Sequence, residues 1–191
     1  HPGFGFLSEN SKFATMCEEV GVKFIGPSGA IMDMMGDKIN ARAQMIKANV
    51  PVIPGSGGEV HTSDEALAVA EKIGYPVMLK ASAGGGGKGI RKVEKAEDLV
   101  AAFESASSEA KAAFGNGAMY MERVIYPARH IEVQILADQH GHVVHLGERD
   151  CSLQRNNQKV LEESPSVAIG KTLRQKIGEA AVRAAKSVGY E

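Results

Sequence analysis

The chain has 191 residues, of which 43% are hydrophobic and 24% are charged. These proportions are typical of a globular protein with a substantial core, arranged as one large or two small domains. The formal net charge of -1 argues against a general nucleic-acid or membrane-surface binder, because both need an excess of cations. No apolar run approaches the roughly 20 residues of a membrane span, so we expect neither nucleic acid nor membrane as a partner.

The two cysteines, Cys17 and Cys151, are too few to form a disulfide framework. This usage suits a reducing cytosol, so we expect a cytoplasmic protein in which both thiols act as small buried hydrophobes. The chain runs from His1 to Glu191 without a terminal signal. We therefore expect it to be cut from something longer.

The first fifty residues predict helices that alternate with a short strand. A helix is expected over 8–21, because apolar residues recur on one face and a glycine follows them. The run 22–27 is predicted to be a strand and turn. Ser28 and Asp37 can each cap a further helix, the second ending before Pro51. This alternation is typical of an α/β domain.

Prolines and glycines mark residues 51–58 as a linker, and we place a domain boundary there. Thr62 and Glu65 form a capping box that opens a helix to about Ile73. A second helix is expected over 95–113, with apolar residues at helical spacing. Two helices and short strands over about 70 residues predict a small lid-like domain.

A glycine loop lies between the two predicted strands of this lid. The first strand alternates Val77 and Leu79 with Met78 and Lys80, which places the two pairs on opposite faces. It runs into four consecutive glycines: Gly84, Gly85, Gly86 and Gly87. A backbone without Cβ atoms suits close approach to a ligand. With lysines before and inside the loop, a nucleotide triphosphate is the natural ligand.

Two other glycine motifs fit this loop poorly. Gly84, Gly86 and Gly89 match the dinucleotide-binding spacing, but a strand follows where that motif needs a helix. The phosphate-binding P-loop needs a glycine at Ser82 and a Ser or Thr at Gly89. A flap that covers phosphates with backbone N–H groups is favoured. A mobile hairpin with solvated lysines is the alternative.

From Ala118 onward the pattern changes to strands, predicted over 119–125, 130–138 and 142–151 as an antiparallel meander. A helix is expected over 172–187. The histidines of the meander do not favour a metal site, because His142 and His145 point to opposite faces of one strand. We therefore predict no metal ligands in this chain.

Polar side chains lie along the strands of the meander, and a further polar run follows over 154–159. His130, Glu132 and Gln134 share one face of a strand, which patterning alone explains equally well as the solvent side of a sheet. The additional lysines and the glycine flap favour a cleft that binds a triphosphate.

Several motifs together resemble one family over the full length of the chain. They are His1 to Asn10, Met35 to Lys38, Lys80 to Gly89, His130 to Gln134 and Gly147 to Ser152. In this order they resemble biotin carboxylase, an ATP-grasp enzyme. The resemblance covers only the middle of the family's fold.

The resemblance implies an α+β ATP-grasp fragment in which a glycine-rich flap domain lies between parts of two larger α/β domains. Residues 1–51 would be the end of the N-terminal domain, 52–124 the lid, and 125–191 the start of the C-terminal domain. The reaction would be carboxylation of carrier-bound biotin by ATP and bicarbonate through carboxyphosphate, as the first half-reaction of an acetyl-CoA or acyl-CoA carboxylase. A biotin carboxyl carrier protein or domain, a carboxyltransferase and a second copy of the full-length enzyme would be its partners.

The resemblance also implies roles for single residues. Lys159 would hold bicarbonate as a catalytic residue. The Mg²⁺ ligands of the family would lie beyond Glu191. ATP would be bound by lysines, the flap, a hinge and two cleft side chains, together with Asn157: Lys38, Lys80, Gly84, Gly85, Gly86, Gly87, Glu122, Arg123, Val124, Ile125, His130, Gln154 and Asn157.

Three residues depart from the family pattern. Asn157 stands where a histidine is usual, and an amide cannot carry the positive charge of an imidazolium. Phe4 and Arg123 replace the usual tyrosine and the common lysine. The alternatives are another ATP-grasp ligase, such as carbamoyl-phosphate synthase or the biotin carboxylase domain of pyruvate carboxylase, and a catalytically silent nucleotide-binding module.

Overall fold

The computed structural model describes residues 1–3, 5–36, 38–82, 89–155 and 158–191. The chain divides into two compact units: unit 1 comprises 1–52 and 128–191, and unit 2 comprises 53–127. The division into three segments that the resemblance implies stays a prediction. Among the described residues, no helix combines the length and apolar character needed to cross a membrane.

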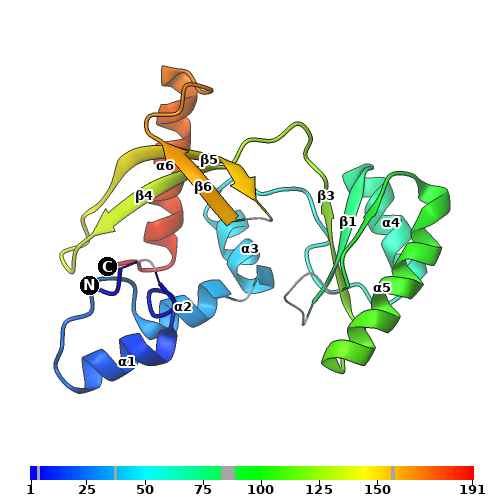
Figure 1. The fold of residues 1–191 in the computed structure, drawn as a ribbon, viewed down its shortest axis with the longest axis horizontal. Coiled ribbons are helices and arrows are strands. Elements are labelled where there is room, and N and C mark those ends of the chain that lie inside the picture. The colour runs from blue at the N-terminus through cyan, green and yellow to red at the C-terminus, as the bar shows by residue number, and fades with distance from the viewer. Residues whose placement is uncertain (4, 37, 83–88, 156–157) are drawn as a thin grey trace. The chain divides into compact units, whose positions relative to one another are not determined.

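Unit 2 is a three-stranded antiparallel sheet in the order β2-β1-β3, against which two helices pack (Figure 1). One face of the sheet covers an apolar core. Val77 and Leu79 point from β1 into this core, as their alternation predicts. The elements are α4 (Ser63–Ile73), β1 (Val77–Ala81), β2 (Arg91–Val93), the 3₁₀ turn η1 (Ala96–Asp98), α5 (Leu99–Phe114) and β3 (Met119–Arg123).

The capping signals of unit 2 are confirmed. The Thr62 side chain accepts a hydrogen bond from the Glu65 N–H, and the Glu65 carboxylate accepts one from the His61 N–H. At the far end of α5, Gly115 adopts a left-handed conformation with φ of 76° and donates to the Lys111 carbonyl. The start of α4 and the end of α5 are therefore fixed by residues close to them in the sequence.

Unit 1 combines helices, four of them within the described residues, with a second antiparallel sheet in the order β4-β5-β6. Helix α6 packs along β4 and β5 (Figure 1) and also contacts α3. The elements are α1 (Ser11–Glu19), α2 (Gly29–Gly36), α3 (Lys38–Lys47), β4 (Ile131–Ala137), β5 (Val143–Arg155), β6 (Gln158–Glu163) and α6 (Lys171–Ser187).

Three predictions for unit 1 need correction. The first helix begins at Ser11 and not at Ser8, because Asn10 is its cap and accepts from the Phe13 N–H at 2.8 Å. Residues 22–27 form no strand, and Phe24 packs edge-on against Phe13 instead. Strand β5 is longer than expected, and the hairpin partner β6 was missed because its side chains are exposed and lack an apolar alternation.

Candidate functional site

The side chains of Lys80 and Glu122 form an ion pair on the sheet of unit 2. Antiparallel pairing sets Lys80 opposite Tyr120 and Met78 opposite Glu122, so Lys80 and Glu122 are diagonal neighbours on one face. The Lys80 ammonium donates to the Glu122 carboxylate, and about a third of the lysine side chain remains exposed. A partly exposed ion pair of this kind contributes about 1 kcal/mol or less to stability. An anionic ligand can therefore compete for the Lys80 ammonium.

The flap glycines Gly84, Gly85, Gly86 and Gly87 lie outside the described residues, but both ends of the loop are defined. The Ala81 N–H donates to the Gly89 carbonyl, and the Ser82 N–H donates to the Ala118 carbonyl, each at 3.0 Å. Gly89 has a φ of +67°, and a Cβ there would lie 2.9 Å from the Ala81 Cβ. The two strands predicted to flank the glycine run are therefore confirmed, because β1 pairs antiparallel with β2.

The predicted hinge spans the last two residues of β3 and the two residues after it, and its backbone is partly occupied by protein contacts. The Arg123 N–H donates to the Pro54 carbonyl and the Val124 N–H donates to the Pro76 carbonyl, both at 2.8 Å. Ile125 is about half exposed. Any base contact made by the backbone of Arg123 or Val124 would thus use a carbonyl oxygen, since both N–H groups are engaged.

Glu132 lies at the centre of a charged cluster on the sheet of unit 1. Register pairs Glu132 with Arg149 across β4 and β5, and the Arg149 Nε donates to the Glu132 carboxylate at 2.6 Å. Lys159, which β6 sets opposite Gln154, donates to the other Glu132 oxygen. Glu162 lies farther away, at 3.6 Å from the Arg149 Nε. Three strands therefore bring two cations onto one carboxylate.

The electrostatics of this cluster keep both partners charged. Burial raises the pKa of Glu132, but hydrogen bonds from Lys159 and Arg149 outweigh it and lower that pKa from 4.5 to about 2. The hydrogen bond to Glu132 raises the pKa of Lys159 above its usual value. Lys159 is therefore a permanent cation at neutral pH. It is suited to hold a small anion and unsuited to accept a proton.

His130 and Gln154 meet at a small pocket of about 440 Å³ that Ala128, Arg129, Ile131 and Ser152 complete. The His130 Nδ1 lies 2.7 Å from the Gln154 Nε2. Arg129 is about 60% exposed and lies 3.5 Å from the Asp150 carboxylate. The pocket wall is thus polar and carries a cation, as a phosphate- or sugar-binding wall needs.

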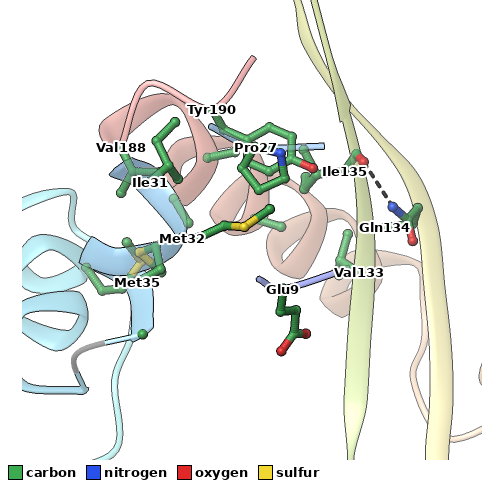
Figure 2. A pocket seen from close by; sticks show the side chains of 15 residues that line it. Glu9, Pro27, Ile31, Met32, Met35, Val133, Gln134, Ile135, Val188 and Tyr190 are labelled. Atoms are coloured by element: carbon green, nitrogen blue, oxygen red, sulfur yellow. Dashed lines mark hydrogen bonds between the residues drawn. The ribbon is translucent and has the colours of Figure 1, made fainter. Parts of the chain in front are cut away.

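An apolar cavity of about 630 Å³ in the same unit offers different chemistry. Figure 2 shows that α2 contributes Ile31, Met32 and Met35 to the lining and that β4 contributes Val133 and Ile135. Its described lining residues include a carboxylate, Glu9, and no lysine or arginine. This cavity therefore does not fit a polyphosphate.

A magnesium ion does not fit the group of potential metal ligands that comes together in unit 1. Within the described parts of the chain, one group of potential ligands gathers: Glu132, Cys151 and Glu162, whose ligand atoms lie within 4.8 Å of one another. Mg²⁺ requires oxygen ligands, whereas burial raises the pKa of the Cys151 thiol and Arg149 and Lys159 already occupy Glu132. Among the described residues, the histidines of the meander join no such group.

The structure brings together only part of the predicted residue set. Lys80 lies beside Glu122 in unit 2, and His130 lies beside Gln154 in unit 1. Lys159 reaches Glu132, which the sequence placed only on a polar face and to which it assigned no role. Lys38 begins α3. Asn157 lies outside the described residues, as do the departure at Phe4 and the capping residue Asp37.

Glu132 and Arg149 were missed because the signal for them is a register, which no single strand carries. The alternation of Glu132 with Val133 indicates which face of its strand Glu132 occupies, and Arg149, two residues before Cys151, shares a face with that cysteine. It does not indicate that the two residues lie opposite each other. A pairing of opposite charges at matched positions of the meander would have been the available clue.

Two family models match the chain. The model described as "Carbamoyl-phosphate synthase L chain, ATP binding domain" matches residues 37–191. The model described as "Biotin carboxylase, N-terminal domain" matches residues 1–32. The first covers well over half of the chain and includes Lys80, His130, Gln154 and Lys159.

Relatives cover the whole chain at high identity. Biotin carboxylase 2 of Bacillus subtilis is 56% identical over 190 residues, which are 100% of this chain and 43% of that protein. Pyruvate carboxylase of Staphylococcus aureus is 52% identical over 100% of this chain and 16% of its own length. The chain thus spans about two fifths of the length of the curated biotin carboxylases it matches.

A solved structure agrees with the fold. The biotin carboxylase domain of Hydrogenobacter thermophilus 2-oxoglutarate carboxylase is 50% identical, with a TM-score of 0.82 over 100% of this chain and 42% of that one. That structure is a domain dimer in complex with MgADP, ADP and bicarbonate. From the matched model, the identity and this structure, the chain belongs to the family of ATP-grasp domains described as the carbamoyl-phosphate synthase L chain, ATP binding domain, and is homologous to biotin carboxylases along its whole length.

Proposed function

We propose that this chain is the central part of a biotin carboxylase, which uses ATP and bicarbonate to carboxylate a biotin carried on a partner protein or domain. The observation that carries the proposal is the Glu132 cluster, in which Arg149 and Lys159 converge on one carboxylate beside the His130 and Gln154 wall. Such a set of fixed charges suits phosphoryl transfer, where the protein contributes positioning and charge neutralisation.

The lysines and the glycine flap have separate parts in this proposal. Lys80 leaves Glu122 and neutralises phosphate oxygens, while the glycines Gly84 to Gly87 cover them with N–H groups. Lys159, held protonated by Glu132, binds bicarbonate as an anion. Bicarbonate attacks the terminal phosphorus of ATP, and ADP leaves. The carboxyphosphate formed breaks into CO₂ and phosphate, and the CO₂ bonds to a nitrogen of biotin whose proton leaves with the phosphate. Lys38 and Asn157 are further proposed contacts of the nucleotide.

The cofactors and partners are proposed by analogy with the relatives. ATP, Mg²⁺ and bicarbonate follow from the ligands named for the Hydrogenobacter domain, and Mg²⁺ would bind to residues other than the Glu132 group. A homodimer of the full-length protein follows from the domain dimer. A biotin carboxyl carrier and a carboxyltransferase complete the proposal. A cytoplasmic location belongs to it as well, supported by two free cysteines.

The decisive experiment measures ATP hydrolysis by the full-length protein with bicarbonate, in the presence and absence of biotin. Stimulation by biotin supports the proposal. Hydrolysis that responds instead to other substrates would support a different ATP-grasp ligase, and binding of ATP without turnover would support a silent module. Because the chain is also 52% identical to a pyruvate carboxylase, the final acceptor is either acetyl-CoA or a keto acid. The same assay, repeated with each acceptor added, distinguishes the two.

The role of Lys80 has its own test. Replacing Lys80 by Gln removes the charge and is expected to lower kcat/KM for ATP by about 10-fold or more, which corresponds to about 1.4 kcal/mol. Lys92→Gln is the matched control, because Lys92 lies on neighbouring β2 and pairs with Glu94 at an exposed position. Equal effects of the two variants would reduce Lys80 to a surface residue.

A further inference from the structure

The side-chain amide of Gln154 has an orientation that its neighbours determine. The Gln154 Nε2 lies 2.8 Å from the Cys151 carbonyl oxygen. The reverse orientation would set the amide oxygen against that carbonyl, two acceptors with no hydrogen between them. The Cys151 carbonyl therefore selects the orientation in which Gln154 presents its NH₂ group.

The same NH₂ group also faces His130. The Gln154 Nε2 lies 2.7 Å from the His130 Nδ1. One of its two hydrogens is donated to the Cys151 carbonyl, so the other is donated to the imidazole. An Nδ1 that accepts a hydrogen bond carries no proton, and in a neutral imidazole the proton is then on Nε2.

The backbone of His130 is held by the same stretch of β5. The Cys151 N–H donates to the His130 carbonyl at 2.7 Å, and the Ser152 hydroxyl accepts from the His130 N–H at 3.0 Å. That hydroxyl donates its own hydrogen to Asp150 at 2.6 Å, which turns its lone pair toward His130. Asp150 is buried and also accepts from the Ser166 hydroxyl at 3.0 Å.

We propose that Gln154, oriented by the Cys151 carbonyl, fixes neutral His130 in the tautomer with its proton on Nε2, and that Asp150 and Ser152 are positioning residues for the same ring. His130 then offers the pocket a hydrogen-bond donor and no acceptor. Its ligand is an acceptor oxygen, and, resting on the proposed function, that oxygen belongs to the sugar or the phosphates of ATP.

The tautomer is measured directly by long-range ¹H–¹⁵N NMR of the histidine rings at alkaline pH without nucleotide, with the His130 signals assigned by their loss in His130→Asn. The expected result is an unprotonated Nδ1 and a protonated Nε2. A protonated Nδ1 in the unmodified protein would overturn the proposal. Because no nucleotide is present, this outcome is independent of whether the protein is a biotin carboxylase.

Variants test the cause. In Gln154→Glu a carboxylate accepts where the amide donates, so His130 is expected to move its proton to Nδ1. Gln154→Met, which neither donates nor accepts, is expected to give a mixture of both tautomers. Gln175→Glu on α6 is the matched control, because Gln175 is exposed and bonds to Glu179. If the His130 ring signals are unchanged in a folded Gln154 variant, Gln154 does not set the tautomer and the proposal is refuted. Should Gln154→Glu fail to fold, Gln154→Met decides.

The positioning residues and the ligand oxygen have separate readouts. Ser152→Ala is expected to shift the His130 backbone amide and ring signals, and Ser152→Thr, which keeps the hydroxyl, to restore them. No shift in Ser152→Ala would overturn the positioning role. Titration with adenosine and with tripolyphosphate distinguishes a sugar oxygen from a phosphate oxygen. Perturbation of the His130 Nε2 by neither of them nor by ATP would refute the ligand assignment.

Discussion

Replacing Glu132 by Gln is expected to destabilise unit 1 in a manner that depends on pH. The substitution keeps the shape of the side chain but removes the charge that Arg149 and Lys159 share. Both cations then lose their common partner on the β4-β5-β6 sheet. The loss is specific to conditions in which Glu132 of the unmodified protein is ionised.

The magnitude follows from the pKa of Glu132, which falls from 4.5 to about 2. Each pKa unit corresponds to about 1.4 kcal/mol, so the shift sets an upper value of about 3 kcal/mol. Because 23% of the side chain is exposed, solvent screening reduces this to about 2 kcal/mol. The folded-state pKa is the lower one. The stabilisation by ionised Glu132 is therefore complete above pH 4.5 and is lost as the pH falls toward 2.

The assay is urea denaturation of the unmodified protein and of Glu132→Gln at neutral and acidic pH. The free energies of unfolding should differ by about 2 kcal/mol at neutral pH, and the difference should shrink once the pH falls below 4.5. Glu162→Gln is the control, because its carboxylate lies 3.6 Å from Arg149 and is more exposed. Its expected effect is below about 1 kcal/mol. A difference that stays constant with pH, or equal losses in both variants, would refute the reasoning.

Three further outcomes are expected. Gly29→Ala should lower the free energy of unfolding in urea by about 1–3 kcal/mol, because the new Cβ would lie 2.7 Å from the Ser11 carbonyl oxygen. Gly36→Ala is the control and should have no such effect, because no atom of the described residues lies within 4 Å of its Cβ position. Asn157→His in the full-length protein should lower the KM for ATP; an unchanged or higher KM would show that the site is adapted to asparagine. The 191-residue chain with ATP, Mg²⁺, bicarbonate and free biotin should release no phosphate in a biotin-dependent way, and release above a blank would contradict this.

The sequence alone determined most of the elements and the family. The alternation of Val77 and Leu79 with Met78 and Lys80 predicts β1 and its buried face, and the structure confirms both. The cap at Thr62 is equally local. These features depend on neighbours within four residues along the chain, and such interactions are already specified by residue order.

The errors occur where local signals are absent or ambiguous. The apolar run at 22–27 is compatible with a strand, but a strand needs a partner for its backbone, and here Phe24 packs on Phe13 of α1 instead. Strand β6 has six exposed residues, so no alternation reveals it. Its existence depends on backbone pairing with β5, which is a property of the folded sheet.

The charge cluster was decided only by tertiary structure. The sequence places Glu132, Arg149 and Lys159 on separate segments, up to 27 residues apart. The antiparallel register of β4, β5 and β6 brings them together, and a slip of one residue would turn each strand's side chains to the other face. The orientation of Gln154 has the same origin, because the Cys151 carbonyl selects it only after β5 has formed. Residue order fixes which groups each strand carries, whereas register, set by packing of the whole sheet, fixes which groups meet.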